Sequence, residues 1–141
     1  MKNDTRIYID GVFDMFHIGH LECLRKCRKL SENPYLIVGI ISDKDAESYK
    51  RKPIIEHKNR IEIIKALKDV DEVIEYPPLI INKLFMDKHN IDLVAHSFSN
   101  NADIEAQKKF FEVPISLNKF AIVNYHEGIS TTSIMEKILE K

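Results

Sequence analysis

The segment that most constrains the fold runs from Gly11 to His20, with the sequence Gly-Val-Phe-Asp-Met-Phe-His-Ile-Gly-His. A short apolar run, Ile7 to Ile9, precedes it, and an amphipathic helical pattern from about Ile18 to Leu30 follows it. A strand that passes through a glycine turn into a helix is a common phosphate site, because the N–H groups at the start of the helix attract anions. The segment therefore predicts an α/β fold with an anion-binding turn after its first strand.

Two glycines and two histidines of this segment have separate expected roles. Gly11 lets the chain turn without a Cβ clash, and Gly19 lets a ligand approach the backbone closely. His17 and His20 are three residues apart, so on a first helical turn they lie on one face and point at the anion that the helix dipole attracts. The alternative is a pair of ordinary surface histidines, which the flanking glycines and the preceding strand disfavour.

Length and composition fit one domain, residues 1–141, in which 44% of residues are hydrophobic and 30% are charged. A net charge of −1 gives no global basic field for nucleic acid. No apolar run approaches the ~20 residues of a membrane span, and residues 1–6 do not resemble a signal peptide, so we expect a cytoplasmic protein. Cys23 and Cys27, one helical turn apart, are expected to be reduced packing residues, since no further cysteine completes a metal site.

Strand and helix patterns alternate along the chain, which predicts a doubly wound, Rossmann-like parallel sheet of about five strands. Strands are expected at residues 6–10, 35–41, 70–76, 91–96 and 120–124. Helices are expected at residues 18–30, from 60 onward, at 79–90, from 103 to about 111, and at 130–139. Residues 42–57 form a polar segment that we expect to be a long mobile loop. Leu30 of the first helix, and Leu84 and Phe85 of the third, are expected to face the sheet.

Ligands of open parallel sheets bind beyond the carboxyl ends of the strands, where four segments of this chain should converge. These segments are residues 11–20, 42–52, 96–101 and 125–132. The last one leads into Ser130, Thr131, Thr132 and Ser133, whose hydroxyl groups at a helix N-terminus can donate to phosphate oxygens. The alternative is a plain N-cap at Ser130, which needs only one of them.

Four matches now point to one family. Gly11-Val12-Phe13-Asp14 followed by His17-Ile18-Gly19-His20 resembles the opening motif of the cytidylyltransferases, which join CTP to a phosphorylated alcohol. The His-x-Gly-His element alone marks a wider nucleotidyltransferase superfamily that also uses ATP. Gly128-Ile129-Ser130-Thr131 resembles the second motif, Arg-Thr-Glu-Gly-Ile-Ser-Thr, and Lys68 to Val73 is similar to the family's Arg-x-Val-Asp-Glu-Val, which lies at a dimer interface. Lys50 and Arg60 fall on a lysine and a helix-starting arginine of the choline- and ethanolamine-phosphate enzymes.

The resemblance implies a reaction in which a phosphate oxygen of the acceptor attacks the α-phosphorus of CTP and pyrophosphate leaves, with Mg²⁺ accompanying CTP. It implies three catalytic residues, His17, His20 and Lys50. The nucleotide contacts that it implies are Gly11, Val12, Phe13, Gly19, His96, Gly128, Ile129, Ser130 and Thr131. The acceptor contacts that it implies are Asp14, which could meet a substrate ammonium, Arg60 and Tyr125. It further implies that the protein is a homodimer. It also implies that the side chains of the protein form no tight metal site. A solvated loop is the alternative for Lys50, Arg51 and Lys52, and a solvated strand entry is the alternative for residues 68–73.

The chain departs from the family at two places. Tyr125 and His126 stand where the family has Arg-Thr, and Ser97-Phe98 stands where the choline enzymes carry Asp-Asp after the histidine that His96 matches. Residues 33–39 and 94–96 resemble the choline enzymes, so the leading hypothesis is transfer to phosphocholine or phosphoethanolamine to give a CDP-alcohol for phospholipid or surface-polymer synthesis. The alternatives are glycerol 3-phosphate as acceptor, or a nucleotide-binding protein of the same fold that has lost catalysis.

Overall fold

The structure is a computed structural model that describes residues 4–124 and 128–141. Within these residues five parallel strands form one sheet, which confirms the predicted parallel sheet of about five strands. The strand order is β3-β2-β1-β4-β5. The strands are β1 (Thr5–Gly11), β2 (Pro34–Ile40), β3 (Glu72–Ile74), β4 (Leu93–His96) and β5 (Phe120–Ile122). The chain builds one half of the sheet outward from β1 to β3 and then crosses to β4 on the other side of β1. The strand order therefore reverses at β1 and β4, which is where α/β folds of this kind bind ligands.

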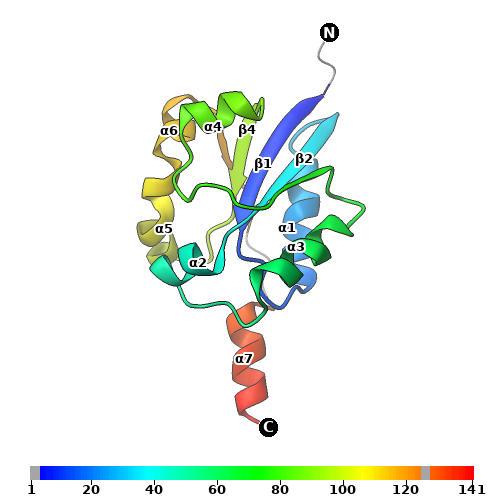
Figure 1. Cartoon of the computed structure of the whole chain (residues 1–141), viewed down its shortest axis with the longest axis vertical. Coiled ribbons are helices and arrows are strands. Elements are labelled where there is room, and N and C mark those ends of the chain that lie inside the picture. The colour runs from blue at the N-terminus through cyan, green and yellow to red at the C-terminus, as the bar shows by residue number, and fades with distance from the viewer. Residues whose placement is uncertain (1–3, 125–127) are drawn as a thin grey trace.

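Helices cover both faces of the sheet (Figure 1). One face carries α1 (Ile18–Arg28) and α3 (His57–Lys65), and the other carries α4 (Lys83–Lys88), α5 (Asn101–Gln107), the 3-10 turn η1 (Lys108–Phe111) and α6 (Glu112–Ser116). Two further helices, α2 (Asp43–Tyr49) and α7 (Thr131–Leu139), lie near the carboxyl ends of the strands, and α7 projects away from the rest of the fold. None of the described helices has the length and apolar content that crossing a bilayer requires.

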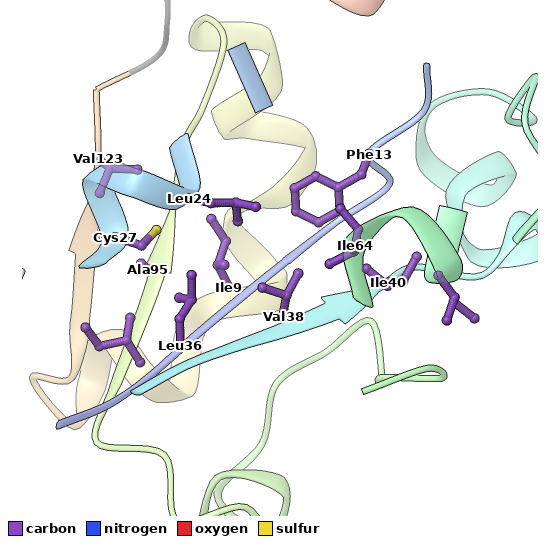
Figure 2. Close-up of a cluster of buried hydrophobic side chains, with 12 residues drawn as sticks. Ile9, Phe13, Leu24, Cys27, Leu36, Val38, Ile40, Ile64, Ala95 and Val123 are labelled. Atoms are coloured by element: carbon purple, nitrogen blue, oxygen red, sulfur yellow. The ribbon is translucent and has the colours of Figure 1, made fainter. Parts of the chain in front are cut away.

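The two faces have separate apolar cores because successive side chains of a strand point to opposite sides. Ile7 and Ile9 of β1 belong to the cluster under α1 and α3, part of which Figure 2 shows, whereas Tyr8 between them belongs to the cluster under α4 and η1. Each fully buried Ile or Leu contributes roughly 1.5–3 kcal/mol. Cys27 is fully buried in the first cluster and Cys23 is packed against it, and both are free thiols. Their expected role in packing agrees with this position.

The polar segment at residues 42–57 differs from the long loop that the sequence predicted. It begins with the seven-residue helix α2, whose N-cap is Ser42. The Ser42 Oγ atom accepts a hydrogen bond from the Asp45 N–H group at 3.2 Å, and Asp43 and Asp45 lie in the first turn, where the helix dipole favours negative charge. The loop that remains is shorter and carries Lys50, Arg51 and Lys52 at its start.

Two side chains were assigned to the wrong environment. Leu84 was expected to face the sheet, but it is 78% exposed, and Phe85 and Met86 form the buried side of α4 instead. With only six residues, α4 buries one side of a single turn, so helical spacing could not distinguish Leu84 from its neighbours. Leu30 lies beyond the end of α1 and is 38% exposed.

Candidate functional site

A cavity of about 690 Å³ lies at the carboxyl ends of β1 and β4. Its walls come from the turn after β1, the end of α2, the loop after β4 and the start of α7. These are the four segments that the sequence predicted to converge, apart from residues 125–127, which include Tyr125 and lie outside the described residues. The volume is within the range of small-molecule sites, roughly 300–1,000 Å³.

His17 and His20 form the N-terminal cap of α1. The Nδ1 atom of His17 accepts a hydrogen bond from the Gly19 N–H group at 3.0 Å, and the Nδ1 atom of His20 accepts one from the His17 N–H group at 3.1 Å. The two rings are stacked with their centroids 3.9 Å apart. Because each Nδ1 atom is an acceptor, the neutral rings carry their protons on Nε2. Both histidines line the cavity, so the pair brings two imidazole N–H donors to it.

Gly19 has a steric role in this arrangement. A Cβ atom at position 19 would lie 2.8 Å from the Cε1 atom of His17, so a side chain there would displace the capping ring. The sequence assigned Gly19 to close approach by a ligand. Gly19 lines the cavity, so that role stays a prediction, and the structure also shows close approach by the His17 ring.

The charge state of His20 follows from its surroundings. Burial, and after it the neighbouring His17 and Lys50, lower the pKa of His20 from 6.5 to about 3. The imidazole is therefore neutral near pH 7, and it acts as a hydrogen-bond donor without adding a positive charge.

The cations expected beside a phosphate group come from the end of α2. Lys50 and Arg51 both line the cavity. Burial of the Lys50 ammonium, followed by the Arg51 charge, lowers the pKa of Lys50. The Arg51 Nη1 atom donates to the Thr132 Oγ1 atom at 3.3 Å, which connects this segment to the start of α7.

The hydroxyl groups at the start of α7 are engaged within the protein. Ser130 is the N-cap, and Ser130 and Ser133 exchange hydrogen bonds of 3.0 and 2.8 Å between side chain and backbone. The Thr131 Oγ1 atom donates to the Asp14 carbonyl oxygen at 2.8 Å. The capping alternative thus accounts for the two serines. Residues 129–132 still line the cavity, whereas Gly128, with a φ of 96° that glycine tolerates, does not.

Asp14 and Arg60, both assigned to the acceptor, form hydrogen bonds with the backbone of the loop after α2. The two Asp14 carboxylate oxygens accept the N–H groups of Ile54 and Ile55 at 2.7 and 2.8 Å. The Arg60 side chain is fully buried and lies outside the cavity lining. Its guanidinium group donates to three backbone carbonyls and to one carboxylate, namely those of Ile55, Val12, Ile41 and Asp43. The Arg60 guanidinium is therefore engaged inside the protein, away from the cavity. Asp14 also lines the cavity, and its assignment to the acceptor stays a prediction.

Asp10, which the sequence analysis missed, is the carboxylate whose position does suit a ligand. It lines the cavity, is 6% exposed, and accepts a hydrogen bond from the Tyr8 hydroxyl at 3.5 Å. Burial raises the pKa of Asp10 from 3.8 to about 7. Its place at the end of a buried strand, directly before the glycine turn, was the available signal. His96 at the end of β4 also lines the cavity, as expected, and its Nδ1 atom lies 3.9 Å from the Asp10 Oδ1 atom.

The remaining residues of the nucleotide assignment, Gly11, Val12, Phe13 and Ile129, line the same cavity. Within the part of the chain that the structure describes, no group of three or more His, Cys, Asp or Glu side chains is placed to hold a metal ion.

The segment expected at a dimer interface, Lys68 to Val73, has its carboxylates paired within the chain. Asp71 accepts a hydrogen bond from Arg28 at 2.8 Å, and Glu72 accepts one from the Tyr35 hydroxyl at 3.0 Å. These contacts fit a strand entry, and they do not test the dimer.

Comparison with known proteins decides the family. The family model described as "Cytidylyltransferase-like" matches residues 8–137 of this chain. The chain belongs to this family.

Curated relatives align with nearly all of this chain. Choline-phosphate cytidylyltransferase 2 of Arabidopsis thaliana is 38% identical over 137 residues, which cover 96% of this chain and 45% of that protein. Ethanolamine-phosphate cytidylyltransferase of Dictyostelium discoideum is 30% identical over 138 residues, which cover 98% of this chain and 38% of that protein. The chain therefore spans less than half the length of these curated relatives.

A solved structure supports the fold. The lipopolysaccharide core biosynthesis protein from Thermoplasma volcanium GSS1 superposes with a TM-score of 0.65 at 24% identity, over 89% of this chain and 98% of that one. At this identity the similarity concerns the fold alone.

Proposed function

We propose that this protein is a cytidylyltransferase that transfers the CMP group of CTP to a phosphorylated amino-alcohol, phosphocholine or phosphoethanolamine. The products are a CDP-alcohol and pyrophosphate. One observation carries the proposal: a neutral histidine pair caps a helix at the edge of the cavity, with both Nδ1 atoms used by the cap and both Nε2 atoms carrying protons. The named relatives agree with this reaction class.

The reaction places demands on charge that these residues meet. A phosphate oxygen of the acceptor attacks the α-phosphorus of CTP, the bond to the bridging oxygen breaks, and pyrophosphate leaves with the electron pair. Negative charge grows on the α-phosphate oxygens and on the leaving group. The Nε2–H groups of His17 and His20 donate to those oxygens, while Lys50 and Arg51 supply positive charge. The acceptor brings its own nucleophile, so no side chain needs to be activated.

The magnesium ion that the family resemblance implies is proposed to enter with the triphosphate. The described residues offer no cluster of three ligands, and Mg²⁺ is often held by substrate phosphates together with water. When bound, the ion would neutralise charge on the triphosphate. The part played by the chain is then to bind and orient the nucleotide complex.

The test is pyrophosphate release from CTP with phosphocholine, phosphoethanolamine and glycerol 3-phosphate as acceptors. Two variants separate chemistry from folding. Asn is among the best N-cap residues and Gln at the third helical position completes a capping box, so His17→Asn and His20→Gln should keep the start of α1 while removing the imidazole donors.

Each variant should retain the wild-type melting temperature and lose roughly 10²–10³ in kcat. His89→Gln changes a histidine outside the cavity lining and is the matched control. Absence of pyrophosphate release by the wild type with all three acceptors would overturn the proposal. Full turnover in both capping variants would overturn the role of the histidines.

A further inference from the structure

The α5 side of the cavity holds a second set of polar groups that the transfer step does not use. We call it the head-group subsite and define it by Asp10, His96, Ser97, Asp103 and Gln107. All five residues line the cavity. They come from the ends of β1 and β4, the loop after β4, and α5.

Two residues of the head-group subsite have buried polar atoms that have no hydrogen-bond partner among the described residues. Neither ring nitrogen of His96 nor the Oγ atom of Ser97 has one among the described residues, and His96 is only 7% exposed. The Gln107 amide lies near enough to His96 to favour its protonated form. The two groups do not have the geometry of a hydrogen bond. Buried polar groups in folded proteins are almost always paired, so these atoms have bonding capacity for a ligand.

Two carboxylates flank the same place. Asp10 lies 3.9 Å from the imidazole of His96. Asp103 is held rigidly, because it accepts hydrogen bonds from the Ser99 N–H and hydroxyl groups and from the Gln107 amide. Burial lowers the pKa of both His96 and Lys50, and the charge of Asp103 opposes this effect at each, which indicates a negative potential on this side of the cavity. The head-group subsite is therefore suited to a cation.

The small number of aromatic rings in the cavity lining indicates which type of cation fits. Quaternary ammonium groups, which have no N–H bond, are recognised by the faces of several aromatic rings, with tryptophan the most favourable. This chain has no tryptophan, and Phe13 and Tyr49 are the only Phe or Tyr residues among the described residues that line the cavity. The Phe98 ring packs edge-on against His96 and Phe111 instead. Carboxylate, imidazole and hydroxyl groups are acceptors for N–H donors, and a primary ammonium provides three of these.

We propose that the head-group subsite binds the ammonium group of the acceptor and selects a primary ammonium over a quaternary one, with Asp103 and Gln107 as specificity-determining residues. The inference rests on the proposed function and narrows its acceptor to phosphoethanolamine or a similar primary amine. A site built for N–H donors strongly rejects an analogue that lacks them, because its buried acceptors are then left unpaired.

The experiment is a graded substrate series at saturating CTP. Phosphoethanolamine and its N-methyl, N,N-dimethyl and trimethyl forms, the last being phosphocholine, are compared by kcat/KM, with glycerol 3-phosphate alongside. The value of kcat/KM should fall with each methyl group and be on the order of 10²-fold lower for phosphocholine. Equal or better use of phosphocholine would overturn the selectivity and leave the proposed function intact. Pyrophosphate release with none of the acceptors, or with glycerol 3-phosphate alone, would overturn both.

Two variants test the α5 residues. Asp103→Asn and Gln107→Met should each reduce the phosphoethanolamine to phosphocholine preference about tenfold or more while leaving KM for CTP unchanged. Glu105→Gln, at an exposed carboxylate of the same helix outside the cavity lining, is the matched control and should keep the preference. A preference unchanged in folded Asp103→Asn and Gln107→Met proteins would remove both residues from the assignment.

Discussion

Asp10→Asn should change how the stability of the protein depends on pH. Burial raises the pKa of the Asp10 carboxyl from 3.8 to about 7, against a smaller opposing effect of the Tyr8 hydroxyl. Between these two values the folded protein retains a proton that the unfolded chain has lost. Rising pH therefore destabilises the folded state, because the folded protein must then ionise a carboxyl that is 6% exposed. Asparagine keeps the shape of the side chain and has no proton to lose.

The size of the effect follows from the two pKa values. One pKa unit corresponds to about 1.36 kcal/mol, and integrating the difference in bound protons from pH 5 to pH 8 gives roughly 2–3 kcal/mol. The free energy of unfolding of Asp10→Asn, minus that of the wild type, should grow by this amount over the interval. Other titrating groups around the cavity are present in both proteins, so their effects largely cancel in the difference.

The measurement is urea unfolding of both proteins at pH 5 and pH 8 without ligand. Asp87→Asn, at an exposed carboxylate of α4, is the matched control, and its difference from the wild type should stay within about 0.5 kcal/mol. A difference between Asp10→Asn and the wild type that is constant over the interval would refute the reasoning. It would mean that the Asp10 carboxyl titrates alike in the folded and unfolded states.

Three further outcomes are expected. CTP should slow tryptic cleavage after Lys50 and Arg51, since the phosphates would bind this basic segment, and equal cleavage with and without CTP would contradict that. The resemblance of Lys68 to Val73 to a dimer segment predicts a homodimer, and sedimentation that gives only monomer at micromolar concentration would oppose it. Arg60→Leu should lower the free energy of unfolding by roughly 3 kcal/mol or more, because it leaves Asp43 and three carbonyls without their partner. A loss below about 1 kcal/mol in urea unfolding would show that water replaces the guanidinium.

The sequence predicted the architecture because the signals for it are local. Continuous apolar runs such as 35–41 mark strands buried on both faces, and chain order then places the following segments at one edge. The helix α2 escaped prediction because it is short and polar, so it lacks the apolar period by which helices are recognised. Its only local signal was the cap at Ser42.

The site was predicted less completely for a different reason. His17 and His20 stand in a motif whose spacing already specifies a helix start, so their placement in the cavity could be anticipated. Asp10 becomes a neighbour of His96 because β1 pairs with β4, and Asp103 does so only when α5 packs on the sheet. No spacing in the sequence expresses either contact. The partners of Arg60 could not be predicted, because a motif gives only its position along the chain, whereas its partners are carbonyls that the folded backbone brings together.

The capping box depends on a neutral His20 imidazole, which burial favours first and the neighbouring His17 and Lys50 favour after it. Protonation of Nδ1 would place an N–H group of His20 against the N–H group of His17 and break the cap of α1. The pKa of His20 is about 3 in the folded protein and near 6.5 in the unfolded chain, so the unfolded chain binds the extra proton as pH falls, and the stability that is fully present above pH 6.5 is lost. Between pH 6.5 and pH 4 this amounts to roughly 3 kcal/mol.

His20→Gln retains an acceptor for the same N–H group and has no such proton equilibrium. Its unfolding free energy, minus that of the wild type, should therefore rise by roughly 3 kcal/mol as pH falls over that interval, measured by urea unfolding at both ends. The same variant should have lost its turnover at pH 7, so one substitution would improve acid stability and abolish the chemistry. Parallel stability curves for His20→Gln and the wild type would show that His20 is as free to protonate in the folded protein as in the unfolded chain. Burial in the folded protein would then not be what keeps the imidazole in the neutral form that donates to phosphate.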